Sequence, residues 1–317
     1  MALKEKLLVE FSTHTNEYLS GESLAETFQV SRAAVWKAVK SLQQEGYVID
    51  SSSTKGYCFT DQNDFLREDM IRAFSGITDT PMYVFDEVDS TNNYAKVLCA
   101  KGTPHGTLVV ANHQTAGRGR QGHSFYSPKN TGLYFTLVIK PENDAFISRI
   151  TPAAAVATVD AIEEITGIHP GIKWVNDLFV GTRKIAGILT EAITDFETRT
   201  MDYVIIGIGI NCKEMEFPEE IQNTAASLNA DRMSRSALAG ALQRHLLHRT
   251  AHLDEDLMER YRKDSIVLGQ KITYSRNNEL FTGIAVDIND AGNLIIKKPD
   301  DSTEVLQSGE ISIRNWQ

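Results

Sequence analysis

The sequence has few of the residues that mark secreted or membrane proteins. Its 317 residues include three cysteines, Cys58, Cys99 and Cys212, which lie far apart and form no Cys-x-x-Cys pair. Cysteines spaced in this way are typical of a protein whose thiols stay reduced. No run of eighteen apolar residues occurs, and the first residues lack the long apolar stretch of a signal peptide. We therefore expect a cytoplasmic protein that does not bind membranes.

An excess of basic charge is also absent. The 32 Lys and Arg residues face 42 Asp and Glu, so the net charge is −10 and the chain is no general polyanion binder. Residues 1–60 hold six basic and seven acidic residues, yet residues 31–44 contain Arg32, Lys37 and Lys40 without an acid. A DNA-binding role would therefore depend on one helix and on dimerisation.

The first sixty residues predict three helices followed by a β-hairpin. Apolar residues follow a helical stripe through residues 3–11, and Ser20 and Ser31 are placed to cap the next two helices. Two short apolar runs, 47–49 and 57–59, flank a serine-rich turn. This order is typical of a winged helix-turn-helix, with a small helical protein-docking module as the alternative. The candidate DNA-binding residues are Ser31, Arg32, Trp36, Lys37, Lys40 and Lys55.

Residues 114–122 form a glycine-rich loop that holds two arginines and no acid. Gly117 and Gly119 allow tight turns that expose backbone N–H groups. Arg118 and Arg120 add planar, permanently charged groups suited to a phosphate or carboxylate. We expect a loop that closes over an anionic ligand, and the alternative is an ordinary flexible surface loop.

This loop fits two nucleotide-binding patterns only formally. A strand is predicted before it at residues 108–111, but the segment 123–128 ends in a proline and does not begin a helix, as a dinucleotide-binding fingerprint requires. The spacing is one residue short of a P-loop, with His123 where that motif needs lysine. We reject both motifs.

Two further segments suggest a site. Asn176-Asp177 forms a turn between apolar stretches, and Lys184 stands at the mouth of a predicted strand, where a solvated edge lysine is the alternative. Residues 203–211 form a buried strand by their apolar run. Its glycines permit close backbone approach, and Asn211 could present an amide to a base or ribose. We interpret Cys212 as a small buried residue.

The remainder of the chain indicates a mixed fold. Strands alternate with helices between residues 81 and 263, and one helix is capped by Thr151, opens at Pro152 and runs to Gly167. The last fifty residues show short strands separated by turns at 276–278, 289–292 and 299–301, a pattern typical of a small β-barrel. Three histidines share one helical face, but no carboxylate or cysteine completes a metal site, so we expect surface side chains at His245, His248 and His252.

Several motifs then identify a family. In chain order they are Asp89-Ser90-Thr91-Asn92, Gln114, Gly117-Arg118-Gly119-Arg120, Lys173-Trp174-x-Asn176-Asp177, Lys184-x-Ala186-Gly187-Ile188-Leu189, Gly207-x-Gly209-Ile210-Asn211 and Thr224-Ala225-Ala226-Ser227-Leu228. Together they resemble the family of bifunctional biotin–protein ligases and biotin-operon repressors, over the whole chain. Val175 replaces the proline usual in the Lys-Trp-Pro-Asn-Asp motif. His123 and Phe125 stand where the family usually has arginine and tryptophan, so the outer part of the loop departs from the pattern.

The resemblance implies an α+β fold of three domains. It places a winged helix-turn-helix at 1–62, a class II synthetase-like mixed α/β catalytic domain at 63–265, and a small SH3-like β-barrel at 266–317. It implies an enzyme that uses ATP and Mg²⁺ to make biotinyl-5′-AMP and transfers biotin to a lysine of a biotin carboxyl carrier protein. It also implies a homodimer that represses transcription at operator DNA in response to biotin.

The resemblance assigns roles by motif position. The biotin-binding residues would be Ser90, Thr91, Asn92, Gln114, Gly117, Arg118, Gly119, Arg120 and Lys184. The nucleotide-binding residues would be Arg120, Trp174, Asn176, Asp177 and Asn211. The catalytic residues would be Arg118, Arg120 and Lys184, with magnesium carried by ATP rather than by a protein-only site. The alternatives are a lipoate or octanoate ligase on the same fold, a repressor without catalysis, and a ligase without DNA binding.

Overall fold

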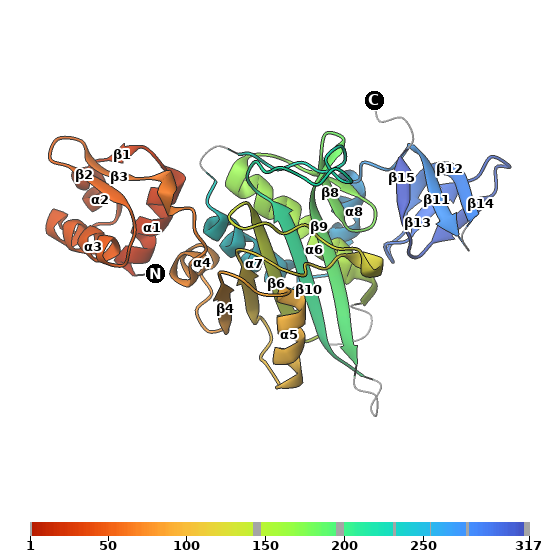
Figure 1. The fold of residues 1–317 in the computed structure, drawn as a ribbon, viewed down its shortest axis with the longest axis horizontal. Helices are drawn as coiled ribbons and strands as arrows, with labels where there is room; N and C mark the ends of the chain where they lie inside the picture. Colours follow the sequence, from red (N-terminus) through yellow and green to blue (C-terminus); the bar gives the residue numbers. More distant parts are fainter. Residues whose placement is uncertain are drawn as a thin grey trace.

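The computed structural model describes residues 2–141, 147–194, 200–230, 233–253, 255–276 and 279–313. Three units follow one another along the chain: a small N-terminal unit, a central unit built on a large sheet, and a C-terminal sheet (Figure 1).

The N-terminal unit is a helix-turn-helix with a small sheet. Ser20 and Ser31 are confirmed as N-caps, because their hydroxyls accept the backbone N–H of Ser23 at 2.9 Å and of Ala34 at 3.1 Å. The strand expected from residue 47 begins two residues later, because its pairing with β3 starts at Ile49, opposite Phe59. The elements are α1 (Leu3–Thr13), β1 (Tyr18–Leu19), α2 (Gly21–Thr27), α3 (Arg32–Gln44), β2 (Ile49–Ser52) and β3 (Gly56–Phe59), with strand order β1-β3-β2.

The helix α4 (Glu68–Ser75) joins the N-terminal unit to the central one (Figure 1). Met70 packs into the core of the N-terminal unit, whereas its neighbour Ile71 packs into the core of the central unit. The segment before α4 forms a 3₁₀ turn at Asp61–Asn63. Asn63 is 2% exposed, so this segment, which links the N-terminal unit to α4, is anchored in the structure.

The central unit contains a mixed sheet of seven strands. Only the pair at one edge, residues 82–85 with residues 108–111, is parallel, and all other neighbouring strands are antiparallel. The strands, in spatial order, are β4 (Met82–Phe85), β5 (Leu108–Ala111), β6 (Gly132–Ile139), β10 (Met201–Asn211), β9 (Arg183–Thr194), β8 (Asp177–Val180) and β7 (Gly171–Lys173). The strands predicted at 108–111 and 203–211 are therefore confirmed, and the expected alternation gives way to a consecutive antiparallel run from β7 to β10.

Helices cover both faces of this sheet. Val204 and Ile206 of β10 face the core shared with α6 (Ile147–Thr166) and α7 (Arg235–Ala251), whereas Tyr203 and Ile205 pack beneath α5 (Thr91–Ala100). This alternation is the side-chain periodicity of a strand with both faces buried. The helix α8 (Glu255–Lys263) packs beside α6.

The start of α6 differs from the prediction. The helix begins at Ile147, so Thr151 is not its cap and Pro152 lies inside it. A proline lacks the N–H that would bond the carbonyl four residues earlier, here that of Ser148. Ser148 lies in the first turn, so the missing hydrogen bond falls near the helix terminus, and the helix tolerates the proline.

The C-terminal unit is a five-stranded antiparallel sheet. The turns at 289–292 and 299–301 are confirmed, whereas residues 277 and 278 of the third expected turn lie outside the described residues. The described ladders end at β14 and β15 without joining them, so barrel closure stays a prediction. The strands are β11 (Lys271–Arg276), β12 (Glu279–Ile288), β13 (Leu294–Lys297), β14 (Thr303–Leu306) and β15 (Ile311–Ile313).

Two further sequence expectations concern membrane binding and the three histidines near the end of α7. In the described part of the chain, no helix is both long and apolar enough to cross a membrane, and no group of side chains is arranged to hold a metal ion. His245 lies 2.7 Å from Glu164, and the exposed His248 and His252 stack with ring centroids 4.8 Å apart.

We predict that Gly240→Ala destabilises the packing of α7 on α4. A Cβ at this position would lie 2.5 Å from the Ile71 carbonyl oxygen and 2.6 Å from Phe74 Cβ. Overpacking costs about 1–3 kcal/mol, against roughly 1 kcal/mol gained from the helix propensity of alanine. We expect a net loss of about 1 kcal/mol in the free energy of unfolding, measured by urea denaturation. His248→Ala, an exposed change on the same helix, should stay within about 0.5 kcal/mol, and equal stability of both variants would contradict this packing.

Candidate active site

A pocket opens on the face of the central sheet that α5 covers, next to two glycines of β10. Gly207 and Gly209 continue the face occupied by Tyr203 and Ile205, so the sheet is hollow beyond α5. A Cβ on Gly207 would lie 2.2 Å from Asn92 Oδ1, and one on Gly209 would lie 2.4 Å from the ring of Phe125. The predicted close approach to these glycines is confirmed.

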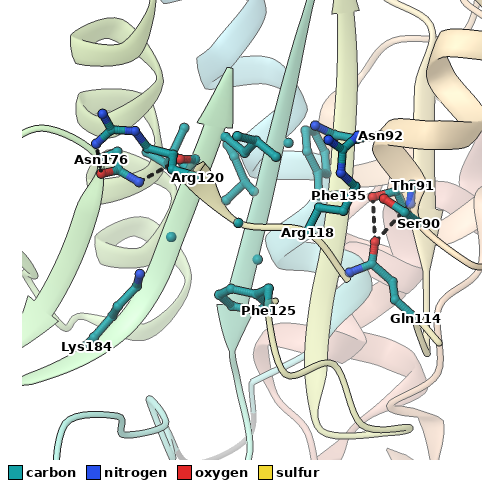
Figure 2. A pocket seen from close by; sticks show the side chains of 17 residues that line it. Ser90, Thr91, Asn92, Gln114, Arg118, Arg120, Phe125, Phe135, Asn176 and Lys184 are labelled. Atoms are coloured by element: carbon teal, nitrogen blue, oxygen red, sulfur yellow. Dashed lines mark hydrogen bonds between the residues drawn. The ribbon is translucent and has the colours of Figure 1, made fainter. Parts of the chain in front are cut away.

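Neutral polar groups form one end of the pocket. The Gln114 side-chain oxygen accepts the backbone N–H of Thr91 at 2.9 Å and its hydroxyl at 3.1 Å (Figure 2). The Thr136 hydroxyl, fully buried in β6, donates to Asn92 Oδ1 at 2.7 Å. Ser90 caps α5 by accepting the N–H of Asn93. These groups begin α5 and follow β5, so the helix and sheet fix a set of donors and acceptors.

Backbone hydrogen bonds fold the glycine-rich loop over the pocket. The Gly119 N–H donates to the His123 carbonyl at 2.7 Å, and the Phe125 N–H donates to the Gly117 carbonyl at 2.9 Å. A Cβ on Gly117 would lie 2.4 Å from the Phe125 carbonyl, so this position requires glycine. The loop also places the Phe125 ring beside Gly187 and Gly209.

Cationic groups lie at the opposite end. Arg120 Nη1 donates to Asn176 Oδ1 at 2.9 Å (Figure 2). The turn that carries Asn176 is fixed to β9, because its backbone carbonyl accepts the Ile188 N–H at 2.9 Å and its side-chain amide donates to the Ile188 carbonyl at 2.8 Å. Lys184 Nζ lies 2.6 Å from Asp177 Oδ1. The pocket therefore combines a neutral polar end with a cationic end.

The segment Thr224–Leu228 supports this cationic end. The Lys184 backbone N–H donates to the Thr224 carbonyl, and the Lys184 carbonyl accepts the Ala226 N–H, each at 2.8 Å. Lys173 lies nearby on β7. Burial lowers the pKa of Lys173, the nearby Asp177 carboxylate raises it, and the positive charge of Lys184 lowers it further, so its pKa lies below the usual lysine range.

Comparison with known proteins agrees with these features. Family models match an HTH domain at residues 4–58, the biotin/lipoate A/B protein ligase family at 84–211, and a biotin protein ligase C-terminal domain at 267–314. The bifunctional ligase/repressor BirA of Bacillus subtilis (strain 168) is 32% identical over 324 residues, which cover 98% of each chain. The chain belongs to this family of bifunctional ligase/repressors.

Two other relatives agree. BirA of Escherichia coli (strain K12) is 26% identical over 310 residues, covering 94% of each chain. A solved biotin protein ligase from Aquifex aeolicus, in complex with biotin and ATP, is 27% identical with a TM-score of 0.63, and the match covers 74% of this chain and 98% of that chain. The resemblance drawn from the motifs is thus confirmed for the whole chain.

Most residues assigned from the family motifs line the pocket. Those at its wall are Ser90, Thr91, Asn92, Gln114, Arg118, Gly119, Arg120, Asn176 and Lys184. Four lie elsewhere, and one of these, Gly117, lines an adjacent pocket together with Tyr126 and Pro218. Trp174 is 3% exposed and its indole N–H donates to the Gly292 carbonyl of the C-terminal unit at 2.9 Å. Asn211 donates to the Ala226 carbonyl at 2.9 Å, and Asp177 contacts the pocket through Lys184.

The family motifs did not include Glu191, which organises the side of the pocket. Its carboxylate accepts from Lys96 at 2.7 Å and from the Asn92 amide at 2.9 Å. Arg118 turns toward the same group, with Nη1 3.4 Å from Glu191 Oε1 and 3.1 Å from Asn93 Oδ1. The loop sequence contains no acid, but the fold brings Glu191 of β9 to Arg118, and the loop sequence carries no signal of this contact.

The predicted DNA-binding residues are all exposed. Ser31, Arg32, Trp36, Lys37 and Lys40 belong to α3 or its cap and are all exposed, with Trp36 52% exposed. Lys55, at the tip of the hairpin, lies 5.5 Å from the centre of the Tyr18 ring. The buried face of α3, with Val35, Val39 and Leu42, holds it to the core.

We predict that the stabilisation provided by Glu191 depends on pH. Burial raises the pKa of Glu191, but the hydrogen bonds from Lys96 and Asn92 and the positive charges of Lys96 and Arg118 outweigh burial and leave the pKa below the ordinary value of 4.5. The contribution is therefore complete above pH 4.5 and is lost as the pH falls through the lowered value. Glu191→Gln should cost about 1–3 kcal/mol at pH 7, and the loss should shrink below pH 4.5 in denaturation experiments. An exposed control, Glu219→Gln, should show neither effect, and a pH-independent loss in Glu191→Gln would contradict the ion pairing.

Proposed function

We propose that this chain is an ATP-dependent biotin–protein ligase that also acts as a biotin-responsive transcriptional repressor. The observation that carries the proposal is that one pocket holds a neutral polar cluster at one end and Arg120 and Lys184 at the other. The bicyclic ureido group of biotin is neutral and both donates and accepts hydrogen bonds, whereas its carboxylate and the phosphates of ATP are anionic. A pocket with one polar and one cationic end fits both substrates.

The reaction has two steps. The biotin carboxylate attacks the α-phosphorus of ATP, which forms a carbon–oxygen–phosphorus anhydride and releases pyrophosphate. The amine of a lysine on a biotin carboxyl carrier protein then attacks the anhydride carbonyl, forms an amide and releases AMP and a proton. Neither step requires a covalent bond to the enzyme, so catalysis depends on holding two anions together and compensating their charge.

We assign the ureido group to the neutral end. Thr91, Asn92 and Gln114 are held by hydrogen bonds among themselves and with Thr136, so their positions are fixed before a ligand binds. Ser90, buried at the start of α5, adds a hydroxyl. Gly117 and Gly119 bring the loop backbone close enough to cover this group.

We assign the carboxylate and phosphates to the cationic end. Arg120 faces neutral Asn176, so its charge is available to an anion. Lys184 would contact the acyl-phosphate junction and exchange its partner Asp177 for the ligand. Magnesium, carried with ATP, would neutralise phosphate charge. Asp177 suits that ion or its waters, because its carboxylate would lose its ammonium partner when Lys184 turns to the ligand.

Binding also requires the loop to move. The pocket holds only about 50 Å³, because the Phe125 ring and the loop fill it. Sites for ligands of this size enclose roughly 300–1,000 Å³. The loop of residues 117–126 would therefore open for the substrates and close over biotinyl-5′-AMP, keeping water from the anhydride.

The repressor role rests on α3 and its neighbours. Arg32, Lys37 and Lys40 are exposed on α3, but a single unit offers few phosphate contacts. A homodimer would double them and would match an operator with inverted repeats. Biotin and ATP would strengthen operator binding if the adenylate complex favours the dimer.

The finer boundaries of the fold belong to this proposal. We infer domains at 1–62, 63–265 and 266–317, a class II synthetase-like catalytic domain, and an SH3-like barrel at the C-terminus. The match of a C-terminal ligase domain to residues 267–314 supports the last boundary. We also propose a cytoplasmic enzyme, which suits an operator and a carrier protein as partners.

Purified protein, a biotin carboxyl carrier domain, ATP, Mg²⁺ and labelled biotin test the ligase assignment directly. We expect biotin on the carrier lysine, and no transfer when lipoate or octanoate replaces biotin. Transfer of lipoate or octanoate instead would favour the acyl ligase alternative. Biotin binding without transfer would favour a repressor that has lost catalysis.

We predict that Arg120→Ala impairs adenylation much more than folding. Removing one charge-assisted interaction in a closed site costs about 2.7–4 kcal/mol, or roughly 100- to 1,000-fold in rate. Arg120→Lys should restore only part of it, since an ammonium lacks the planar fork. Biotin-dependent ATP–pyrophosphate exchange measures the loss. Arg183→Ala removes an exposed arginine nearby and should leave the rate unchanged. A wild-type exchange rate in folded Arg120→Ala would remove Arg120 from the mechanism.

We predict that Lys40→Ala weakens operator binding while ligation stays at the wild-type rate. Without the Lys40 ammonium, each subunit of the dimer neutralises one phosphate fewer, which should reduce affinity at every sequence and lower the salt slope by about 2. Binding is measured by fluorescence anisotropy with operator DNA from the biotin operon, with biotin and ATP present, at several salt concentrations. Lys6→Ala, an exposed lysine of α1, is the matched control. If both variants bind the operator equally well, α3 is not the DNA-binding helix.

A further inference from the structure

Arg235 is a buried cation outside the pocket, and the proposed reaction does not use it. It is the first residue of α7 and only 1% exposed. A guanidinium loses much solvation when it is buried, so a protein retains one only when partners satisfy its N–H groups. The partners of Arg235 come from three separate parts of the chain.

The first two partners lie at the ends of the segment that carries the glycine-rich loop. Arg235 Nη1 donates to Asn112 Oδ1 at 2.7 Å and to the Gly132 carbonyl at 3.0 Å. Asn112 also bonds to Asn130, with its amide 2.7 Å from Asn130 Oδ1. Residues 113–131, which include Gln114 and Arg120, therefore leave and re-enter the sheet at points that a single guanidinium joins.

The third partner is Asp64, in the segment that links the N-terminal unit to α4. Its carboxylate accepts from Arg235 Nε at 3.1 Å and from the Arg235 backbone N–H at 2.9 Å, and its carbonyl accepts from Nη2 at 3.0 Å. The side chain of Asp64 is 8% exposed and also pairs with Lys213 at 2.5 Å. Asp64 is thus the counter-ion that orients Arg235.

The segment around Asp64 is in turn fixed to the N-terminal unit. The side chain of Asn63 accepts the Val48 N–H at 2.8 Å and donates to the Val48 carbonyl at 2.8 Å. Arg67 Nη1 donates to the Glu45 carbonyl at 2.7 Å. The end of α3 and the start of β2 therefore connect through residues 63–67 to Arg235, and Figure 1 shows α4 between this unit and the sheet.

We propose that Arg235 is a positioning residue for adenylation, and that Asp64 makes its position depend on the N-terminal unit. Asp64, Asn112, Gly132 and Arg235 form what we call the Arg235 cluster. Arg235 holds the ends of the 113–131 segment at the spacing that places Gln114 and Arg120 at the pocket. The inference rests on the proposed ligase function. It implies that a substitution in the linker, far from the substrates, changes biotin binding.

The coupling has a direct physical basis. A shift of residues 63–67 moves the Asp64 carboxylate, and the guanidinium must either follow it or lose a buried charge-assisted hydrogen bond. If Arg235 follows, its bonds to Asn112 and Gly132 are strained and the loop segment moves. Conversely, loop closure over a ligand acts on the same bonds and reaches the linker. The coupling is reciprocal because it is a free energy shared by the two sites.

The test compares Asp64→Asn and Asn112→Ala in the full-length chain. Asp64→Asn removes the charge that orients Arg235, and Asn112→Ala removes the acceptor at the loop end. Each should raise the KM for biotin in ATP–pyrophosphate exchange about fivefold or more, with a smaller change in kcat. The double variant should resemble the more affected single variant, because both substitutions act through one guanidinium.

Ser236→Ala is the matched control. The Ser236 hydroxyl accepts the Arg67 N–H and donates to the Phe65 carbonyl, each at 3.0 Å, so it ties the same linker to α7 without touching the loop ends. Its KM for biotin should stay within about twofold of wild type even where its melting temperature falls as much as that of Asp64→Asn. Equal KM values in Asp64→Asn and Ser236→Ala, or additive effects in the double variant, would overturn the proposal.

A measurement on the wild-type chain tests the same coupling without depending on whether the variants fold. Hydrogen exchange is followed at residues 60–67 and 113–131 before and after addition of biotin and ATP with Mg²⁺. We expect slower exchange in both segments. Protection of 113–131 without any change at 60–67 would overturn the coupling while leaving the ligase assignment intact. Wild-type protein without biotin-dependent exchange of pyrophosphate would instead overturn the ligase assignment.

Discussion

The pocket depends on two positions in one strand that carry no side chain. From Val204 to Ile210, β10 consists of buried β-branched residues except at Gly207 and Gly209, which lie on the face covered by α5. A single strand with regular side chains would fill this face completely, as Tyr203 and Ile205 do beneath α5. The start of α5 and the Phe125 ring approach the bare backbone instead. The neutral polar cluster and the loop can therefore meet on one surface of the sheet.

Features set by neighbouring residues were predictable from the sequence. The capping serines Ser20 and Ser31 and the buried strand at 203–211 each depend on local hydrogen bonds or on a local apolar pattern, whereas the turn expected at Asn176-Asp177 covers residues 174–176 and Asp177 begins β8. The glycine-rich loop was recognisable for the same reason. The family motifs then brought the pocket residues together, because motifs far apart in sequence belong to one site in every member of a family.

Features that depend on distant partners were not predictable. Glu191 lies 95 residues from Lys96, and Asp64 lies 171 residues from Arg235, so no local spacing signals either pair. The helix α6 starts at Ile147 despite the strong local signal of Thr151-Pro152, because Ile150, in the added first turn, packs into the core of the central unit. Trp174 shows the converse, since its motif suggested a ligand contact and the fold buries it against the C-terminal unit.

The electrostatics of the pocket separate its three cations. Arg118 lies beside Glu191, and Lys184 pairs with Asp177, so an acid compensates each charge in this structure. Arg120, two residues from Arg118 on the same loop, meets only the neutral amide of Asn176 among the hydrogen-bond partners described for it. The field at the cationic end is therefore dominated by Arg120 rather than by the sum of three charges. A phosphate that enters gains most from Arg120, and it gains from Lys184 only after displacing Asp177. The two loop arginines therefore have different roles: Arg118 holds the loop to α5 and β9, and Arg120 binds the anion.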